Sequence, residues 1–114
     1  MHMQARSPEF RHVLLACQEC QKACNQASRA CIESQQVKQF MRCILLNRDC
    51  GLFCNTTATL LEHGSEFLPQ VIKLCIDACE TCASENERSD LLACRRAAEA
   101  CRCFVRECRK TNAI

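Results

Sequence analysis

Apolar and small residues recur along most of the chain at intervals of three and four positions, the spacing of one face of an α-helix. Polar stretches interrupt this pattern near residues 33–36, 63–66 and 84–89. The pattern predicts four helices, at about 8–34, 37–62, 66–85 and 90–110. Four helices with short connections favour an all-α fold, an antiparallel four-helix bundle forming one domain over residues 1–114.

Several helix ends carry specific signals. Ser7, followed by a proline, is suited to cap the first helix. Gly64 can adopt the left-handed conformation that closes the second helix, and Ser65 and Ser89 are candidate caps for the third and fourth. The connection at 33–36 contains neither Gly nor Pro, so this turn is inferred mainly from the size of a domain.

Cysteine occupies the same helical face in all four segments. The chain has 14 cysteines among 114 residues, spaced mostly three, four or seven apart within each predicted helix. This spacing places thirteen of them on one stripe per helix. The thirteen are Cys17, Cys20, Cys24, Cys31, Cys43, Cys50, Cys54, Cys75, Cys79, Cys82, Cys94, Cys101 and Cys108. Cys103, two positions after Cys101, is expected to face outward, and its role is left open.

Thiols therefore take the core positions where a bundle normally carries leucine or isoleucine. Such a core fills less apolar volume, which makes metal ions the expected filler. Soft thiolates select Cu(I), zinc or iron–sulfur clusters. A ladder of thiols on straight helices suits Cu(I), which accepts two or three sulfurs, and equal numbers of Cu(I) and thiolate cancel in charge. We expect the thirteen cysteines to bind multiple Cu(I) ions per chain.

Other interpretations explain part of the pattern. Cysteines three or four apart on one helix rarely have disulfide geometry, and the composition is rich in helix formers rather than turn residues. The CxxC pairs Cys17–Cys20 and Cys79–Cys82 would fit a thiol–disulfide redox protein, although such proteins use one activated pair. Zinc or iron–sulfur binding is a further alternative.

Charge and hydropathy disfavour nucleic acid and membranes as partners. The net charge is +2 and the charges are interspersed, which disfavours nucleic acid. No apolar run approaches the roughly 18 residues of a membrane span, and the first residues lack the order of a secretory signal. We therefore expect a cytoplasmic protein. No catalytic motif stands out, so storage or detoxification of Cu(I), rather than an enzymatic activity, is the favoured function.

The chain resembles the cysteine-rich four-helix bundle copper storage proteins, in particular their cytosolic branch. The resemblance covers nearly the whole chain and is sharpest in ACQECQKAC at 16–24, CILLNRDC at 43–50 and CIDACETC at 75–82. It implies a homotetramer whose bundles bind many Cu(I) ions without catalysing a reaction. Some positions where the family rhythm would place a thiol differ here, namely Ala27, Ile72, Asn86, Ala97 and Phe104.

The two ends of the predicted bundle differ in chemistry. Met41, Cys43 and Cys94 should lie at one mouth, where Met41 is a possible copper entry residue or an ordinary core methionine. The family often has histidine in the last connection, whereas this chain has Glu85, Glu87 and Asp90. An apolar plug is expected at the other end, formed by Phe10, Leu14, Phe67 and Phe104.

Four further residues are expected on the surface. His12 and His63 project away from the cysteine stripes by helical phase, so we expect them to be solvated. Leu45 and Leu52 lie seven apart, opposite the cysteines of the second helix. Outward leucines at this spacing suggest self-association, in agreement with the oligomer that the resemblance implies.

Overall fold

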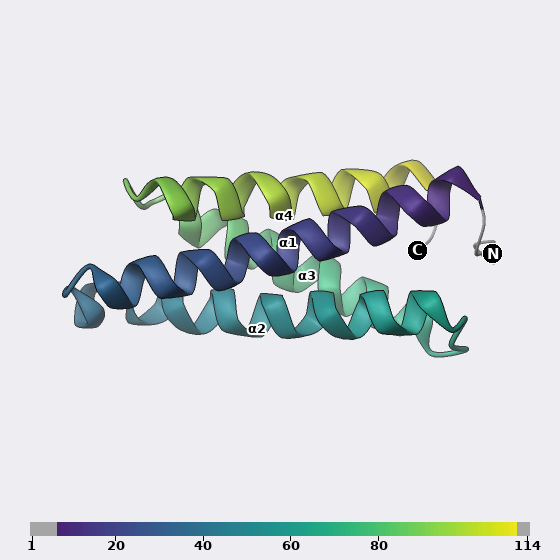
Figure 1. Cartoon of the computed structure of the whole chain (residues 1–114), viewed down its shortest axis with the longest axis horizontal. Coiled ribbons are helices and arrows are strands. Elements are labelled where there is room, and N and C mark those ends of the chain that lie inside the picture. Colours follow the sequence, from purple (N-terminus) through teal and green to yellow (C-terminus); the bar gives the residue numbers. More distant parts are fainter. Residues whose placement is uncertain (1–6, 112–114) are drawn as a thin grey trace.

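The computed structural model describes residues 7–111. Its helices are α1 (Pro8–Glu33), α2 (Val37–Glu62), α3 (Leu68–Asn86) and α4 (Leu92–Thr111). Helix α1 packs against α2 and α4, and α3 packs against the same two helices from the opposite corner (Figure 1). The α1–α2 and α3–α4 connections lie at one end of the molecule, and the α2–α3 connection lies at the other. The predicted antiparallel four-helix bundle is confirmed.

The start of α1 and the end of α2 carry the expected caps. The Ser7 hydroxyl accepts a hydrogen bond from the Phe10 amide at 3.1 Å, which partners one of the free amides of the first turn. Helix α2 ends at Glu62, and Gly64 follows with φ of 65°. Glycine suits this left-handed conformation because it has no Cβ to clash with the backbone.

The reversal between α1 and α2 uses an unexpected residue. Gln35 has φ of 66°, a conformation that costs a residue with a Cβ roughly 1–2 kcal/mol. Ser34 stabilises the turn, since its hydroxyl donates to the Cys31 carbonyl at 2.6 Å and accepts from the Gln36 amide at 3.2 Å. Glutamine in the place where glycine is common explains the weak turn signal in the sequence.

Helix α3 begins at Leu68, two residues later than expected. A start at residue 66 would place Pro69 fourth in the helix, where its missing N–H would leave the first helical hydrogen bond unmade. In the structure Pro69 is second, and the first helical bond runs from the Val71 amide to the Phe67 carbonyl at 3.2 Å. The Ser65 hydroxyl accepts from the Phe67 amide at 3.1 Å, so it stabilises the preceding turn rather than capping the helix.

Helix α4 also begins two residues late, at Leu92 rather than 90. The Ser89 hydroxyl accepts a hydrogen bond from the amide of Leu91, only two residues on, at 3.1 Å. Serine forms this tight local turn as readily as a helix cap. The Leu91 carbonyl then accepts from the Cys94 and Arg95 amides at 3.0 and 3.1 Å, which starts the helix.

The end of the bundle near the α2–α3 connection has an apolar core. Phe104 is completely buried, Phe10 is buried and Leu14 is partly buried, as expected for a plug. Phe67 is 61% exposed, so its assignment to the plug was wrong. It lies in the turn before α3 rather than on the inward face of a helix. Other buried residues complete this part of the core, namely Val13, Leu61 and Ile72.

Candidate metal centre

All thirteen phased cysteines are buried, none with more than 2% of its surface exposed. The helical spacing therefore places their side chains in the interior as expected. All fourteen cysteines are free thiols. Cys103 differs from the rest, since it is partly buried and lines a surface groove between α1 and α4 beside His12 and Glu107. This position separates Cys103 from the thiols of the core.

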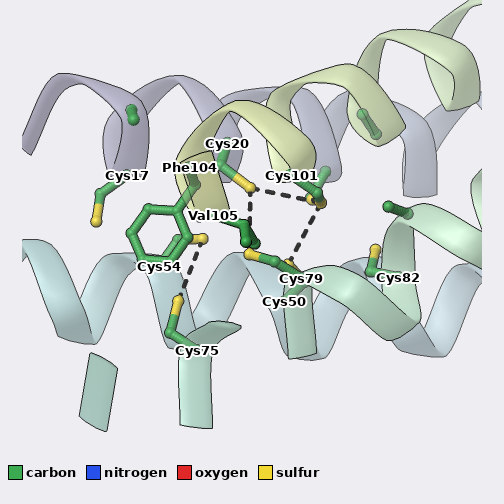
Figure 2. Packing of buried hydrophobic residues seen from close by; sticks show 14 of the residues in the cluster. Cys17, Cys20, Cys50, Cys54, Cys75, Cys79, Cys82, Cys101, Phe104 and Val105 are labelled. Atoms are coloured by element: carbon green, nitrogen blue, oxygen red, sulfur yellow. Dashed lines mark hydrogen bonds between the residues drawn. The ribbon is translucent and has the colours of Figure 1, made fainter. Parts of the chain in front are cut away.

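Sulfur atoms from all four helices meet in the middle of the bundle (Figure 2). Cys20 lies 3.6 Å from Cys101 and 3.8 Å from Cys79, and Cys50 lies 3.5 Å from Cys79, each measured between Sγ atoms. Two overlapping groups of four thiols result, each with all its sulfurs within 4.8 Å of one another. They are Cys20, Cys24, Cys50 and Cys101, and Cys20, Cys50, Cys54 and Cys79.

A separate group of three thiols lies toward the α1–α2 and α3–α4 connections. The Cys94 sulfur is 3.5 Å from that of Cys31 and 3.9 Å from that of Cys43, and all three lie within 4.8 Å of one another. The predicted proximity of Cys43 and Cys94 is confirmed. Met41 is 45% exposed on α2, and its role as a copper entry residue stays a prediction.

The remaining phased cysteines join none of these groups within residues 7–111. They are Cys17, Cys75, Cys82 and Cys108. The Cys75 sulfur lies 3.8 Å from that of Cys54, which connects it to the central groups. The Cys82 thiol donates to the Asn47 side-chain oxygen at 3.2 Å. Figure 2 shows Cys17 and Cys82 on opposite sides of the central sulfurs.

The spacing of the sulfurs suits a soft metal ion held by several thiolates. A metal ion bonded to three coplanar thiolates at about 2.3 Å holds their sulfurs about 4 Å apart. The contacts of 3.5–3.9 Å within the groups match that separation. Each of the three groups consists of cysteine alone, without histidine or carboxylate. Because thiolate is the preferred ligand of Cu(I), these groups fit Cu(I) without rearrangement of the helices.

Hydrogen bonds between thiols lower the pKa of some cysteines, and burial raises the pKa of others. Hydrogen bonding by Cys43, assisted by Ser89 and Cys31, lowers the pKa of Cys94 to about 6. Burial raises the pKa of Cys31 to about 11, and burial raises that of Cys108 to about 12. Most of a thiol with a pKa above 9 is protonated at neutral pH, so Cu(I) must displace its proton on binding.

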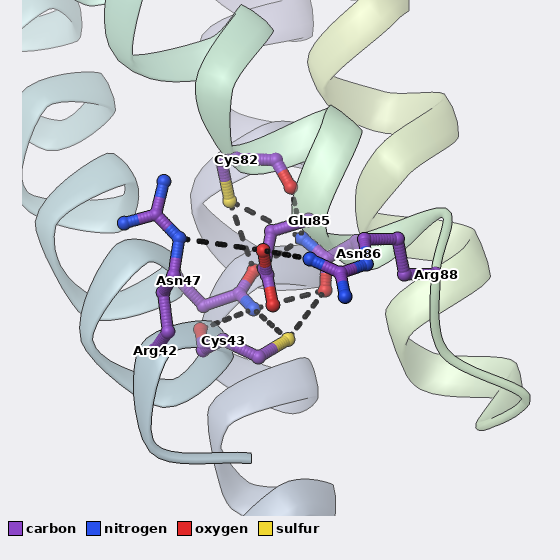
Figure 3. A network of polar contacts seen from close by, with 7 residues as sticks. All are labelled: Arg42, Cys43, Asn47, Cys82, Glu85, Asn86 and Arg88. Carbon is purple, nitrogen blue, oxygen red and sulfur yellow. Dashed lines mark hydrogen bonds and ion pairs between the residues drawn. The ribbon is translucent and has the colours of Figure 1, made fainter. Parts of the chain in front are cut away.

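Two buried asparagines also lie on the cysteine face (Figure 3). Asn47 donates to the Asn86 oxygen at 2.9 Å, and Asn86 donates back to the Asn47 oxygen at 3.0 Å. The Cys43 thiol donates to Asn86 at 3.2 Å, as Cys82 does to Asn47. Asn86 was expected on this face from the sequence, whereas Asn47 was not. Its place four residues after Cys43 and three before Cys50 was the available signal.

The other positions where the family rhythm would place a thiol also face the core. Ala27, Ile72, Ala97 and Phe104 are all completely buried. Each therefore takes a place on the inward stripe that a metal-binding thiol could occupy. The number of sulfurs in the core is reduced accordingly.

The carboxylates in the last turn of α3 and in the α3–α4 connection are paired with arginines. Glu85 lies 3.4 Å from Arg42 and 3.6 Å from Arg88, at the rim beside the asparagine pair (Figure 3). Glu87 forms a two-point contact with Arg102, the shorter distance being 2.9 Å, and Asp90 lies 3.7 Å from Arg95. These contacts tie the connection to α2 and α4.

The remaining surface expectations hold. His12 and His63 are exposed. Leu45 and Leu52 are 50% and 66% exposed on α2. The helices of the described chain include none with the length and apolar character needed to span a bilayer.

Comparison with known proteins identifies relatives of this chain. The Csp family, described as copper storage protein, matches residues 6–113. The uncharacterized cysteine-rich protein YhjQ of Bacillus subtilis (strain 168) is 33% identical over 98 residues, covering 86% of this chain and 91% of that protein. The Cu(I)-bound copper storage protein BsCsp3 is similar in structure with a TM-score of 0.85 and 30% identity, covering 90% of this chain and 96% of that one. Apo copper storage protein 3 from Bacillus subtilis has a TM-score of 0.82 and 32% identity, covering 88% and 95%. The chain thus belongs to the copper storage protein family.

Proposed function

We propose that this protein binds many Cu(I) ions inside its bundle and stores them. The observation that carries the proposal is the set of overlapping, sulfur-only groups in the core, with neighbouring thiols 3.5–3.9 Å apart. Cys20 and Cys50 belong to two groups each, so one thiolate there can bridge two ions. Membership of the copper storage family and similarity to a Cu(I)-bound structure support the same function.

The ligands we propose are the thirteen buried cysteines. Each Cu(I) replaces thiol protons, so a core with about equal numbers of ions and thiolates is nearly neutral and inexpensive to bury. The ligands are Cys17, Cys20, Cys24, Cys31, Cys43, Cys50, Cys54, Cys75, Cys79, Cys82, Cys94, Cys101 and Cys108. Because the ions bind the folded chain, copper should also stabilise the bundle strongly.

We propose a binding function without turnover. The cysteines of both CxxC pairs, Cys17–Cys20 and Cys79–Cys82, are completely buried. A thiol–disulfide enzyme needs an accessible thiolate that attacks a partner's disulfide, and burial prevents that attack. Storage requires only that a small ion reach the thiols.

The free thiols support a location, and the exposed leucines of α2 support a mode of assembly. Free thiols at this density persist in a reducing compartment, which supports the cytoplasm as the place of action. The exposed Leu45 and Leu52 support self-association through α2. The family resemblance implies such self-association, in the form of a homotetramer or another oligomer. A Leu45→Glu/Leu52→Glu variant should run as a smaller species by light scattering, and an unchanged mass would exclude this face from the interface.

An anaerobic Cu(I) titration of the reduced protein tests the function. The near-ultraviolet absorption of copper–thiolate bonds should rise until roughly ten or more ions are bound per chain, and the thiols should become unreactive to alkylation. The absence of Trp and Tyr keeps the background low. The Cys103→Ser variant should have the same capacity because Cys103 lies outside the core. Saturation at one or two ions would refute storage, and metal analysis of protein purified without added metal would reveal zinc or iron instead.

A further inference from the structure

The cysteine face of the bundle has a gap between the three-thiol group and the central groups. On three helices, seven residues separate the two sets of cysteines, about 10.5 Å along an α-helix. The pairs across this gap are Cys31 and Cys24, Cys43 and Cys50, and Cys94 and Cys101. On the same faces within the gap lie Ala27, Asn47 and Ala97, each completely buried and none of them a thiol.

The remaining helix, α3, brings one thiol and one amide to this gap. Cys82 donates to the Asn47 oxygen at 3.2 Å, and Asn86 exchanges hydrogen bonds with Asn47 at 2.9 and 3.0 Å. Among the described residues, Cys82 is thus the one thiol that lies in the gap between the three-thiol group and the central groups. Alanine offers no metal ligand, and amide oxygen and nitrogen are poor ligands for a soft ion such as Cu(I).

The asparagine pair is held firmly in place. Beyond their mutual bonds, the Asn47 amide donates to the Cys43 carbonyl at 2.9 Å and the Asn86 amide donates to the Cys82 carbonyl at 3.0 Å. No buried side-chain nitrogen or oxygen in residues 7–111 lacks a hydrogen-bond partner, so neither amide gains by moving. Displacing the pair to let an ion pass would break at least the two amide–amide bonds.

The three-thiol group lies on the outer side of this barrier. Cys31 is in the last turn of α1, and Cys94 is in the first turn of α4. The end of α1 and the start of α4 lie at the same end of the bundle, beside the α1–α2 and α3–α4 connections (Figure 1). An ion at Cys31, Cys43 and Cys94 is therefore nearer to this end of the bundle than an ion in the central groups.

We propose that the Asn47–Asn86 pair divides the copper store into an outer site for one Cu(I) ion and an inner store for the rest. The outer site consists of Cys31, Cys43 and Cys94. This proposal rests on the proposed storage function and specifies how the stored copper is released. The outer ion leaves without disturbing the amides, whereas ions of the inner store pass the pair only when its two hydrogen bonds break.

Removal of copper by a chelator tests the division. The fully loaded full-length protein is mixed with excess of a colorimetric bidentate Cu(I) chelator under anaerobic conditions, and the coloured complex is followed over time. We expect a fast phase of about one ion and a phase slower by about 5- to 150-fold, since the two amide–amide hydrogen bonds must open. One uniform phase for all ions would overturn the proposal while leaving copper storage intact.

Variants assign the phases. Cys31→Ala/Cys43→Ala/Cys94→Ala should abolish the fast phase and keep the slow one, and a persisting fast phase would overturn the assignment. Cys94→Ala alone makes the same test if the triple variant does not fold. Cys17→Ala, at the other side of the central sulfurs, is the matched control and should keep the fast amplitude.

A second substitution tests the barrier itself. Asn47→Cys/Asn86→Cys places thiols in the gap, so the two stores should merge and the slow phase should accelerate toward the fast one. An unchanged slow phase in this variant, with copper capacity retained, would show that the asparagines are not the barrier. Failure of every variant and of the parent protein to bind copper would instead refute the storage function.

Discussion

The buried asparagine pair makes a sharp prediction for the stability of the copper-free protein. Replacing Asn47 by alanine removes both amide–amide bonds, of 2.9 and 3.0 Å, and leaves the polar side chain of Asn86 facing a small cavity. Each lost bond is worth about 0.5–1.5 kcal/mol, and an incompletely satisfied buried group costs about 1–3 kcal/mol. The Asn47→Ala variant should therefore lose about 2–4 kcal/mol of its free energy of unfolding.

The symmetry of the contacts extends the prediction to the partner. Each asparagine donates to the other, to a carbonyl four residues earlier in its own helix, and accepts from a cysteine thiol. Asn86→Ala should consequently cost nearly as much as Asn47→Ala. The double variant should cost about 1–3 kcal/mol less than the sum, because the second substitution removes an amide that has already lost its partner.

Urea unfolding of the reduced, copper-free protein measures these values. Helical circular dichroism is the suitable signal, since the chain has no Trp or Tyr. The exposed Asn55, also on α2, supplies the control, and Asn55→Ala should change the free energy of unfolding by less than about 0.5 kcal/mol. Single variants no less stable than this control, or strictly additive costs in the double variant, would refute the reasoning.

Three further predictions concern the bundle without copper. Gln35→Gly should stabilise it by about 0.5–1 kcal/mol in urea unfolding, because glycine relieves the left-handed conformation at φ of 66°; a loss of stability would contradict this. Gly51→Ala should also stabilise it by about 0.5–1 kcal/mol. The new methyl group would lie at an ordinary 3.8 Å from the Gln21 carbonyl and too close only to the movable end of the exposed Asn25 side chain, at 2.8 Å; destabilisation would show that Asn25 cannot move. Stability should fall as pH rises above about 9, because the pKa of Cys108 is raised to about 12 and that of Cys17 is raised as well. The unfolded chain then releases protons that the folded chain retains, at about 1.4 kcal/mol per pH unit and thiol. Unfolding midpoints that stay level between pH 8 and pH 10.5 would contradict the raised pKa values.

The helices and the face that each one buries could be predicted from the sequence. The recurrence of cysteine every three, four or seven residues is a local property of each helix, so it predicted inward stripes that the structure bears out. Ser7 and Gly64 marked helix ends for equally local reasons, through a side-chain cap and a backbone without a Cβ. Pro69 carried a local signal too, since its missing N–H requires the helix to begin later than the serine suggested.

Which thiols meet and which are separated depends on how the four helices pack against one another. Helical phase places Cys31 and Cys24 on the same inward face of α1. The register between helices then places Cys31 in the three-thiol group and Cys24 in a central group. The partnership of Asn47 with Asn86 likewise joins two helices, and nothing local to either residue announces it. Spacing along a helix is set by hydrogen bonds within that helix, whereas the height at which helices meet is set by the packing of side chains between them.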